Sequence, residues 1–375
     1  MGKFLKRRIK ICHVSSAHSS TSSRIFHKFC VSSAKAGYDV AFVVADSSKS
    51  RISSGVEIIT IEKPANRLGR FVFTPRKILK VALRQDADIY QLHDPELLQI
   101  VTPLIKRGKK VIFDFHEDVP FQILAKNYIP NALKTCISYI FSLYQFFIVK
   151  KLNAVISATP TIALKFEGRA PRSIAVCNFP DTDFFQKERP KSIRNNSLIY
   201  IGGISEDRGI IETVKSLEYC NQDVTLTLCG TFENDKLKKK VTELEGWKKV
   251  RFRGQIPKNE VIHELNNASF GIVTLHPIRN YREALPIKLF EYMSSGLPVI
   301  ASNFPIWEQI VYDSKCGLCV DPMSAKEISE AINKLVIDTD LAKNMGVNAR
   351  IASQKKYNWE SQFNLAHQLY QQLLS

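Results

Sequence analysis

Short apolar runs alternate with segments of helical periodicity along the first half of the chain. The apolar runs predict strands at 10–14, 39–45, 56–61, 87–93, 110–115 and 154–159. The periodic segments between them predict helices at 24–36, 75–84, 95–107 and 132–150. Strands that are apolar at every position are typical of a parallel sheet covered on both faces. This half is therefore predicted to be a doubly wound α/β domain.

The same alternation begins again after residues 181–196, a polar segment without periodicity that we interpret as a linker. Strands are predicted at 197–202, 224–230, 250–254, 270–275 and 298–302, with helices at 209–220, 233–245, 258–267, 286–295 and from about residue 305. The pattern predicts two α/β domains, 1–185 and 196–357, with ligands bound at the carboxyl ends of their strands.

Charge is distributed unevenly between the two halves. Residues 1–190 contain 30 Lys and Arg against 15 Asp and Glu, whereas residues 191–375 contain 23 against 21. A basic half attracts nucleic acid, an anionic membrane surface or an anionic substrate. The chain has no zinc-finger spacing, no aromatic run of the RNA-binding type and no separate basic tail, so we expect no nucleic-acid partner.

The segment 135–149, TCISYIFSLYQFFIV, contains no charged residue and precedes two lysines. It is shorter than the ~20 residues that a membrane-spanning helix needs. Two interpretations stay open: a helix buried in the protein, or an aromatic-rich helix that lies on a membrane surface. The sequence alone does not decide between them.

The eight cysteines are scattered and mostly lie in apolar runs, which predicts no disulfide framework and fits a reducing cytosol. The basic start of the chain has too short an apolar run for a signal peptide. Cys316 and Cys319 form a CxxC pair without a second pair or a nearby histidine, so zinc is not expected there.

The most informative segment is residues 281–302, YREALPIKLFEYMSSGLPVIAS. It places Glu283 and Glu291 eight positions apart, on the two sides of Pro286, which suits the first turn of a helix. We therefore expect Glu283 in a loop and Glu291 about a turn and a half into the helix. A lysine at Lys288, in the first turn, opposes the helix dipole unless an anion is bound there. The segment thus predicts a diphosphate site, although two solvated glutamates beside an ordinary helix would show the same spacing.

Together, the Glu283-ALPIKLF-Glu291 spacing and the following GLPVIAS resemble retaining glycosyltransferases of the GT-B fold, the large Glu-x7-Glu family also called glycosyl transferases group 1. The resemblance implies two Rossmann-like domains facing each other across a cleft, with the final helix, 358–375, crossing back to the first domain. It implies transfer of a sugar from a UDP or GDP donor with retained anomeric configuration, in enzymes of bacterial surface-polysaccharide assembly. Glu291 would bind the ribose hydroxyls, and Glu283 would lie beside the donor sugar.

The turn 201–209, IGGISEDRG, corresponds to the phosphate-binding turn of that family. Relatives carry a basic residue after the first glycine and another before the later one. Here Gly203 follows Gly202, so only Arg208 matches, and Lys288 is expected to supply the missing charge. Arg208 could otherwise be an ordinary surface arginine. Gly254 is expected where the family contacts the nucleobase through backbone atoms.

Polar residues at predicted strand ends in the first domain complete the candidate site. The resemblance places His116 against the donor sugar, with Asp114 as a group that orients it. His18 and His93 are expected on the acceptor side. Asp94 precedes Pro95 and could simply cap the next helix.

No metal site and no other cofactor are expected, because this fold resembles enzymes that use helix dipoles and basic side chains in place of a metal. The expected partners are a nucleotide-sugar, a glycan or polyprenyl-linked acceptor and an anionic membrane surface, at the cytoplasmic face of the cell membrane. The products would be capsule, exopolysaccharide or lipopolysaccharide. Alternatives are a non-catalytic scaffold that binds through its basic domain, and a nucleotide-sugar epimerase on the same fold. Donor sugar, base, acceptor, linkage and oligomeric state cannot be read from the residues.

Overall fold

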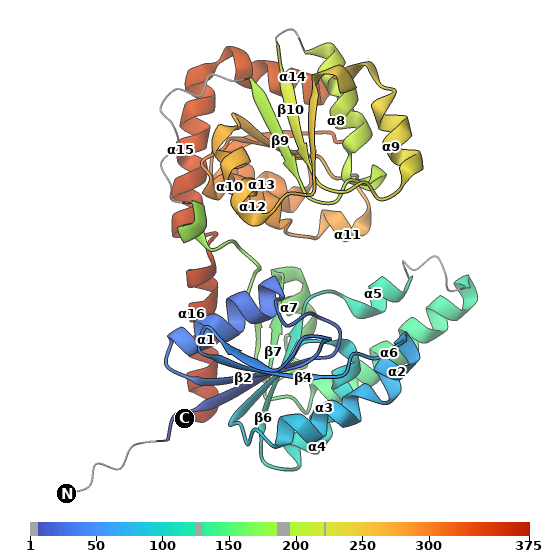
Figure 1. The fold of residues 1–375 in the computed structure, drawn as a ribbon, viewed down its shortest axis with the longest axis vertical. Coiled ribbons are helices and arrows are strands. Elements are labelled where there is room, and N and C mark those ends of the chain that lie inside the picture. Colours follow the sequence, from blue (N-terminus) through green and yellow to red (C-terminus); the bar gives the residue numbers. More distant parts are fainter. Residues whose placement is uncertain (1–6, 125–129, 186–195, 221–222) are drawn as a thin grey trace, which may run out of the picture. The chain divides into compact units, whose positions relative to one another are not determined.

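The computed structural model describes residues 7–124, 130–185, 196–220 and 223–375. Contacts divide the chain into two units, one formed by Met1–Asn178 with Gln362–Ser375, the other by Phe179–Ser361. The predicted linker 181–196 falls partly outside the described residues. Each unit has its own sheet and core, and Figure 1 shows the helices that surround each sheet.

The first unit is built on an eight-stranded sheet with the order β3-β4-β2-β1-β5-β6-β7-β8. All neighbours pair in parallel except β3 and β4. The strands are β1 (Lys10–Ser15), β2 (Asp39–Ala45), β3 (Arg51–Ser53), β4 (Val56–Ile61), β5 (Ile89–Leu92), β6 (Lys110–Phe115), β7 (Ala154–Ser157) and β8 (Ser173–Ala175). The short strands β3 and β8 were not predicted, because three residues give no readable pattern.

Helices of the first unit connect these strands. They are η1 (Ser23–Cys30), α1 (Val31–Lys35), α2 (Arg67–Val72), α3 (Thr74–Leu83), η2 (Pro95–Ile100), α4 (Val101–Ile105), α5 (Val119–Leu124), α6 (Asn131–Val149) and α7 (Pro160–Phe166). The short helix η3 (Thr182–Phe185) belongs to the second unit. The predicted helix 24–36 is in fact a π-helix, η1, followed by one α-helical turn and a half. Such π-turns occur frequently at functional sites.

The second unit has a six-stranded, wholly parallel sheet with the order β11-β10-β9-β12-β13-β14. Its strands are β9 (Ser197–Ile201), β10 (Thr225–Cys229), β11 (Val250–Gly254), β12 (Phe270–Val273), β13 (Val299–Ser302) and β14 (Gly317–Val320). This is the doubly wound strand order 3-2-1-4-5-6, in which strands are first added on one side of β9 and then, from β12 onward, on its other side. Ligands bind such sheets at that point, beyond the carboxyl ends of the strands.

Helices of the second unit are η4 (Glu206–Arg208), α8 (Ile210–Ser216), η5 (Leu217–Tyr219), α9 (Asp235–Thr242), η6 (Glu245–Lys249), α10 (Lys258–Asn267), α11 (Arg279–Arg282), α12 (Ile287–Ser294), α13 (Pro305–Asp313), α14 (Ala325–Ile337) and α15 (Thr339–Lys355), and the final helix α16 is Trp359–Leu374. Gly296, at φ +67°, ends α12 one residue after its C-cap, as predicted. No helix within the described ranges is long and apolar enough to cross a membrane.

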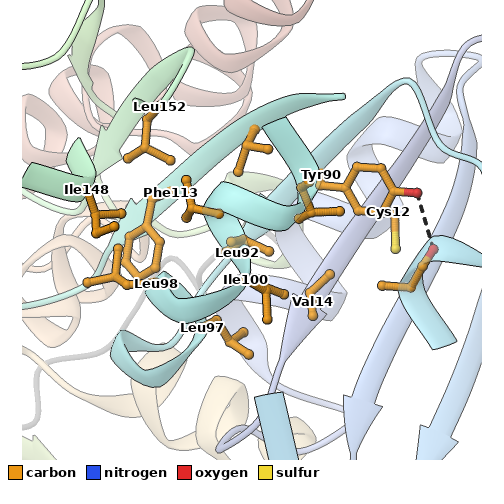
Figure 2. Packing of buried hydrophobic residues seen from close by; sticks show 14 of the residues in the cluster. Cys12, Val14, Tyr90, Leu92, Leu97, Leu98, Ile100, Phe113, Ile148 and Leu152 are labelled. Carbon is orange, nitrogen blue, oxygen red and sulfur yellow. Dashed lines mark hydrogen bonds between the residues drawn. The ribbon is translucent and has the colours of Figure 1, made fainter. Parts of the chain in front are cut away.

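The core of the first unit is formed by strand residues and by residues of the helices that cover the sheet. Figure 2 shows part of it, where Cys12, Val14, Tyr90, Leu92 and Phe113 of neighbouring strands meet helix residues such as Leu97 and Ile148. Burial raises the pKa of the Cys12 thiol to about 12, so this cysteine is packing material and not a nucleophile.

The last turns of α16 are held in the first unit by a buried polar contact. The Tyr370 hydroxyl donates to Gln91 Oε1 at 2.5 Å, and both side chains are inaccessible to solvent. Within the described part of the chain the buried Gln91 Nε2 has no hydrogen-bond partner, so the bond from Tyr370 is what satisfies this amide side chain.

We therefore predict that Tyr370→Phe lowers the free energy of unfolding by about 1–2 kcal/mol, because a buried amide oxygen loses its donor. Chemical denaturation of both proteins would measure this. Tyr219→Phe is the control, because Tyr219 is 57% exposed and its hydroxyl can bond to water in both proteins. Equal losses in the two variants would contradict the assignment.

Candidate active site

The phosphate-binding turn predicted in the second unit is built around two glycines at the end of β9. Gly202 has φ +129°, a conformation that other residues rarely adopt. Gly203 O accepts a hydrogen bond from the Tyr200 hydroxyl at 2.7 Å and another from Arg208 Nη1 at 3.3 Å. The turn is thus fixed from both sides, with Arg208 folded back over it.

The turn ends at Gly209, which introduces α8. Gly209 has φ +70°, and a Cβ atom there would lie 1.8 Å from the backbone oxygen of Thr274. Thr274 follows β12, the strand that neighbours β9 in the sheet. Glycine at 209 therefore lets the loops after β9 and β12 approach each other at the point where the strand order reverses.

Lys288 reaches this turn from α12. Its Nζ lies 3.8 Å from the centre of the Tyr200 ring and would be 3.5 Å from a Cβ atom on Gly202. Arg208 Nη1 would be 3.0 Å from a Cβ atom on Gly203. A larger residue at 203 would compete with the Arg208 guanidinium for the same space. The two cations therefore converge on the space above the glycine pair.

The Lys288 ammonium group is buried and has no hydrogen-bond partner among the described residues. Burial, together with the neighbouring Arg208 guanidinium, lowers the pKa of Lys288 to about 7, and Glu291 opposes this only in part. A buried cation without a bonded partner is costly, and it becomes favourable when an anion binds. This is the strongest indication of a ligand in the second unit.

Arg208 is held by tyrosines. Burial alone would lower its pKa, but hydrogen bonding to Tyr281 and the proximity of Tyr200 raise the pKa of Arg208 above its usual value. Arg208 therefore stays charged and aimed at the turn. Tyr281 was not singled out from the sequence, since nothing in its spacing distinguishes it from an exposed aromatic residue.

The two glutamates of the predicted pair have different surroundings. Glu291 is the fifth residue of α12, and its charge raises the pKa of Lys288. Glu283 follows the short helix α11 and its carboxylate is 3.9 Å from Arg279 Nε, with 46% of the side chain exposed. Pro286 is the N-cap of α12, one position before the predicted first turn. Gly254 ends β11 with φ +66°, and its position faces open space.

The first unit gathers histidines at the carboxyl ends of β1, β5 and β6. His93 Nδ1 lies 3.1 Å from Asp114 Oδ2, and His116 Nε2 lies 3.0 Å from the same oxygen. His93 Nε2 lies 3.2 Å from His13 Nδ1. Burial lowers the pKa of His93 to about 4 and holds the pKa of His13 well below its usual value, so both are neutral. Because His93 is neutral, its Nδ1 donates to Asp114 and its Nε2 accepts from His13.

Asp114 is the centre of this cluster. Arg24, on the π-helix η1, donates from Nε and Nη2 to the two oxygens of Asp114, and its Nη1 donates to Val176 O. Burial would raise the pKa of Asp114, but Arg24 and the histidines hold it well below its usual range. The sequence indicated that Asp114 orients His116, which fits this contact, but it did not indicate Arg24 or His13. His13 could have been noticed as a polar residue inside an otherwise apolar strand.

The proposed capping role of Asp94 is wrong. Its backbone precedes η2, but its side chain makes no cap bond there. The carboxylate instead accepts from Ser15 Oγ and Ser16 N, each at 2.7 Å, and lies 2.9 Å from His18 Nδ1. Several donors of the serine-rich loop outcompete the single N–H group of a helix end. Although burial opposes it, Asp94 raises the pKa of His18, which favours an imidazolium ion there.

These groups line a cavity of about 580 Å³ within the first unit. Its polar side is formed by His18, His93, Asp94 and His116, and its apolar side by residues of α2, α5 and α6. His18, His93 and His116 are therefore brought together in one cavity, and their roles on the acceptor side and at the sugar stay predictions.

One group in the described residues has metal-ligand geometry. The ligand atoms of His93, Asp114 and His116 lie within 4.8 Å of one another. Both Asp114 oxygens already accept from the Arg24 guanidinium, and a metal ion there would have to compete with that cation. The donor set therefore fits a hydrogen-bonded cluster better than a cation site.

Comparison with known proteins finds a similarity that falls within the second unit. Residues 181–352 match the family model of glycosyl transferases group 1. This match is to the family that the sequence resembles, and it includes both Arg208 and Lys288.

Two glycosyltransferases from other organisms are similar to about half of this chain. The chain is 25% identical over 203 residues to D-inositol 3-phosphate glycosyltransferase of Corynebacterium jeikeium, which is 51% of this chain and 47% of that protein. It is 24% identical over 190 residues to the capsular polysaccharide biosynthesis glycosyltransferase CapM of Staphylococcus aureus, 48% of each chain. The chain therefore spans about half the length of these relatives.

Solved structures match nearly the whole chain. Sucrose-phosphate synthase from Thermosynechococcus elongatus has a TM-score of 0.76 at 18% identity, covering 98% of this chain and 99% of that one. HepE of Anabaena, in complex with UDP, has a TM-score of 0.71 at 15% identity, covering 97% and 100%. At such identities these matches show the fold, and they confirm the predicted GT-B class with its two parallel sheets.

We predict that the stability of the protein rises with pH above the Lys288 pKa. The unfolded lysine, with its usual pKa near 10.5, keeps a proton that the folded one loses above about pH 7. Between pH 7 and about 8.5 this should add roughly 1–2 kcal/mol to the free energy of unfolding. Lys288→Met should remove that increment, as measured by urea denaturation at both values.

Lys236→Met is the matched control, because Lys236 is an exposed lysine on α9 of the same unit. It should keep the wild-type increment. An increment that survives in Lys288→Met would show that Lys288 is not the titrating group.

Proposed function

We propose that this protein is a retaining glycosyltransferase that transfers a sugar from a nucleoside-diphosphate donor to a glycan acceptor. The observation that carries the proposal is the Lys288 ammonium group, buried and without a bonded partner beside Arg208, within the segment that matches the group 1 family model. A diphosphate supplies the two negative charges that this arrangement lacks. The family match and the names of the relatives support glycosyl transfer as the activity.

Each donor-site residue has a proposed role. Arg208 and Lys288 bind the diphosphate and stabilise the negative charge that develops on it as the sugar leaves. Gly202 and Gly203 let the backbone approach the phosphates, and Gly254 borders the base. Glu291 accepts hydrogen bonds from the ribose hydroxyls, and Glu283 contacts the sugar. The retained configuration rests on the resemblance alone.

On the acceptor side, the polar wall of the 580 Å³ cavity fits hydroxyl groups, which can both donate to and accept from histidines. We propose that His18 and His93 bind the acceptor and that His116 serves the transferred sugar. Transfer is proposed to need no metal, since two basic side chains provide the charge compensation. A lipid-linked acceptor at the inner face of the cell membrane, in capsule, exopolysaccharide or lipopolysaccharide synthesis, fits the basic first unit. The relative CapM is a capsular enzyme by its name.

Two alternatives of different class remain distinguishable. A scaffold that only binds a membrane or partner would have no use for a buried ammonium group aimed at a glycine turn. A nucleotide-sugar epimerase would bind the nucleotide but need no acceptor. Nucleotide binding therefore separates the scaffold from the two enzymes, and transfer to an added acceptor separates the enzymes.

The direct test is calorimetric titration with UDP and with GDP, each with and without EDTA. We expect one nucleotide to bind, with an affinity that EDTA leaves unchanged. Glu291→Ala should weaken it by about 10- to 100-fold, because a charge-assisted bond to a ribose hydroxyl is worth about 1.5–3 kcal/mol. Glu308→Ala, on the helix after β13 of the same unit, is the control. Absence of binding by either nucleotide would make the scaffold the better account.

The assignment of Glu283 needs a separate measurement. We expect Glu283→Ala to bind the nucleotide nearly as tightly as the wild type but to lose transfer of the sugar from the donor. Until the acceptor is known, the readout is hydrolysis of a nucleotide-sugar that carries the base found to bind, measured by the release of free nucleotide. Unchanged turnover in Glu283→Ala would refute its place beside the sugar.

A further inference from the structure

Helix α6 of the first unit is apolar on its exposed side as well as on its buried side, where Ile148 and Val149 join the core. Its exposed side carries Leu133, Ile137, Tyr139, Ile140, Leu143 and Phe147, with exposed fractions between 42% and 65%. Five of these, Leu133, Ile137, Ile140, Leu143 and Phe147, are spaced three or four residues apart and so form one stripe. A surface helix of a soluble protein normally carries polar residues on its exposed side.

The buried side of α6 contains polar residues. Ser138 and Gln145 are almost completely buried, and the Ser138 hydroxyl donates to Pro120 O at 2.8 Å. The helix therefore has polar residues that could have faced water, yet it exposes an apolar stripe instead. Of the two interpretations of segment 135–149, simple burial of the whole helix is excluded, because its apolar stripe lies outside.

A second helix extends this apolar surface. On and just after α2, Leu68, Phe71, Val72 and Phe73 expose between 40% and 73% of their areas. Phe71 lines the same cavity as Ile137 and Phe141 of α6, so the two helices border a common opening. Figure 1 shows α2 and α6 on the same side of the first unit. We call these ten exposed residues, four from α2 and its end and six from α6, the α2–α6 surface.

The surroundings of the α2–α6 surface are basic. No charged residue occurs from 135 to 149, and the stripe ends at Lys150 and Lys151, both exposed. Arg76 and Lys77 are exposed in α3, which begins directly after Phe73. An apolar helix face with lysines at its border fits the boundary between lipid headgroups and acyl chains of an anionic bilayer.

We infer that the α2–α6 surface is the site at which this protein binds an anionic lipid bilayer. Helix α6 would lie in the plane of the headgroups, since no described helix can span a membrane. The apolar side of the 580 Å³ cavity begins at Phe71, Ile137 and Phe141, and its polar side holds His18 and His116. An acceptor with an apolar tail could thus keep its tail among lipids while its head enters the cavity.

Placing the acceptor in this cavity rests on the proposed function, whereas bilayer binding itself does not. A second copy of the chain is the other partner that an apolar surface could take. The excess of basic side chains around the surface disfavours it, since two identical basic faces repel each other.

The test is flotation of the full chain with vesicles of phosphatidylcholine, with or without phosphatidylglycerol. We expect binding to the anionic vesicles and weak binding to the neutral ones. The double variant Ile140→Asp, Phe147→Asp should reduce binding by more than about tenfold, because two inserted apolar side chains are lost. The charge variant Lys150→Glu, Lys151→Glu should lose mainly the preference for phosphatidylglycerol.

Ile52→Asp and Leu164→Asp are the matched controls, because both residues are exposed apolar side chains of the same unit outside the α2–α6 surface. They should bind vesicles like the wild type. Binding that survives in the Ile140, Phe147 variant, or is lost equally in the controls, would overturn the inference. So would a dimer in sedimentation that this variant converts to monomers, without vesicle binding by either protein.

Each variant is also titrated with UDP and GDP, so that failure of membrane binding can be distinguished from failure of the proposed glycosyltransferase function. Nucleotide binding without flotation would contradict the membrane surface and leave the proposed function intact. Flotation without nucleotide binding would contradict the proposed function alone. Retained nucleotide binding also shows that each variant is folded.

Discussion

The second unit depends on the convergence of two cations on one glycine turn. Lys288 comes from α12 and Arg208 from the turn itself, and both reach the space above Gly202 and Gly203. Several features make this possible: the positive φ of Gly202, the close approach of Gly209 to Thr274, and Tyr200, whose ring lies under Lys288 while its hydroxyl holds Gly203. Like charges so close together are unfavourable in the free protein and become favourable when an anion binds. The turn is therefore preorganised at the expense of stability, as functional sites often are.

In the first unit, by contrast, the buried carboxylates of the cavity have partners. Asp114 is neutralised by Arg24, and Asp94 by the serine loop and His18. Burial keeps His13 and His93 neutral, and the carboxylates orient the histidines at the cavity without an external ligand. The two units thus differ in chemical state: the second holds an unpaired positive charge for an anion, whereas the first presents histidines that are neutral or already paired with a carboxylate.

Much of this arrangement could be predicted from the sequence, and the reasons are physical. Continuous apolar strands and glycine or proline at helix ends predicted the doubly wound class, because these signals are local. The Glu283–Glu291 segment predicted Lys288 as an anion ligand, because a lysine in the first turn of a helix needs an explanation. The π-helix η1, the ion pair of Arg24 with Asp114 and the contact of Asp94 with Ser15 could not be predicted. They join residues 79 to 90 positions apart, or depend on a backbone irregularity with no local pattern.

Lys288 is the proposed ligand of a bound anion, and the proton that the protein takes up when a nucleotide binds tests this role most directly. One pH unit above the Lys288 pKa of about 7, most of the free protein should have lost this proton. A bound diphosphate restores the charge, so titration of UDP or GDP in buffers of different ionisation enthalpy should show uptake of close to one proton per nucleotide. Lys288→Met should bind more weakly and take up none. Tight nucleotide binding by the wild type with no proton uptake would contradict the account.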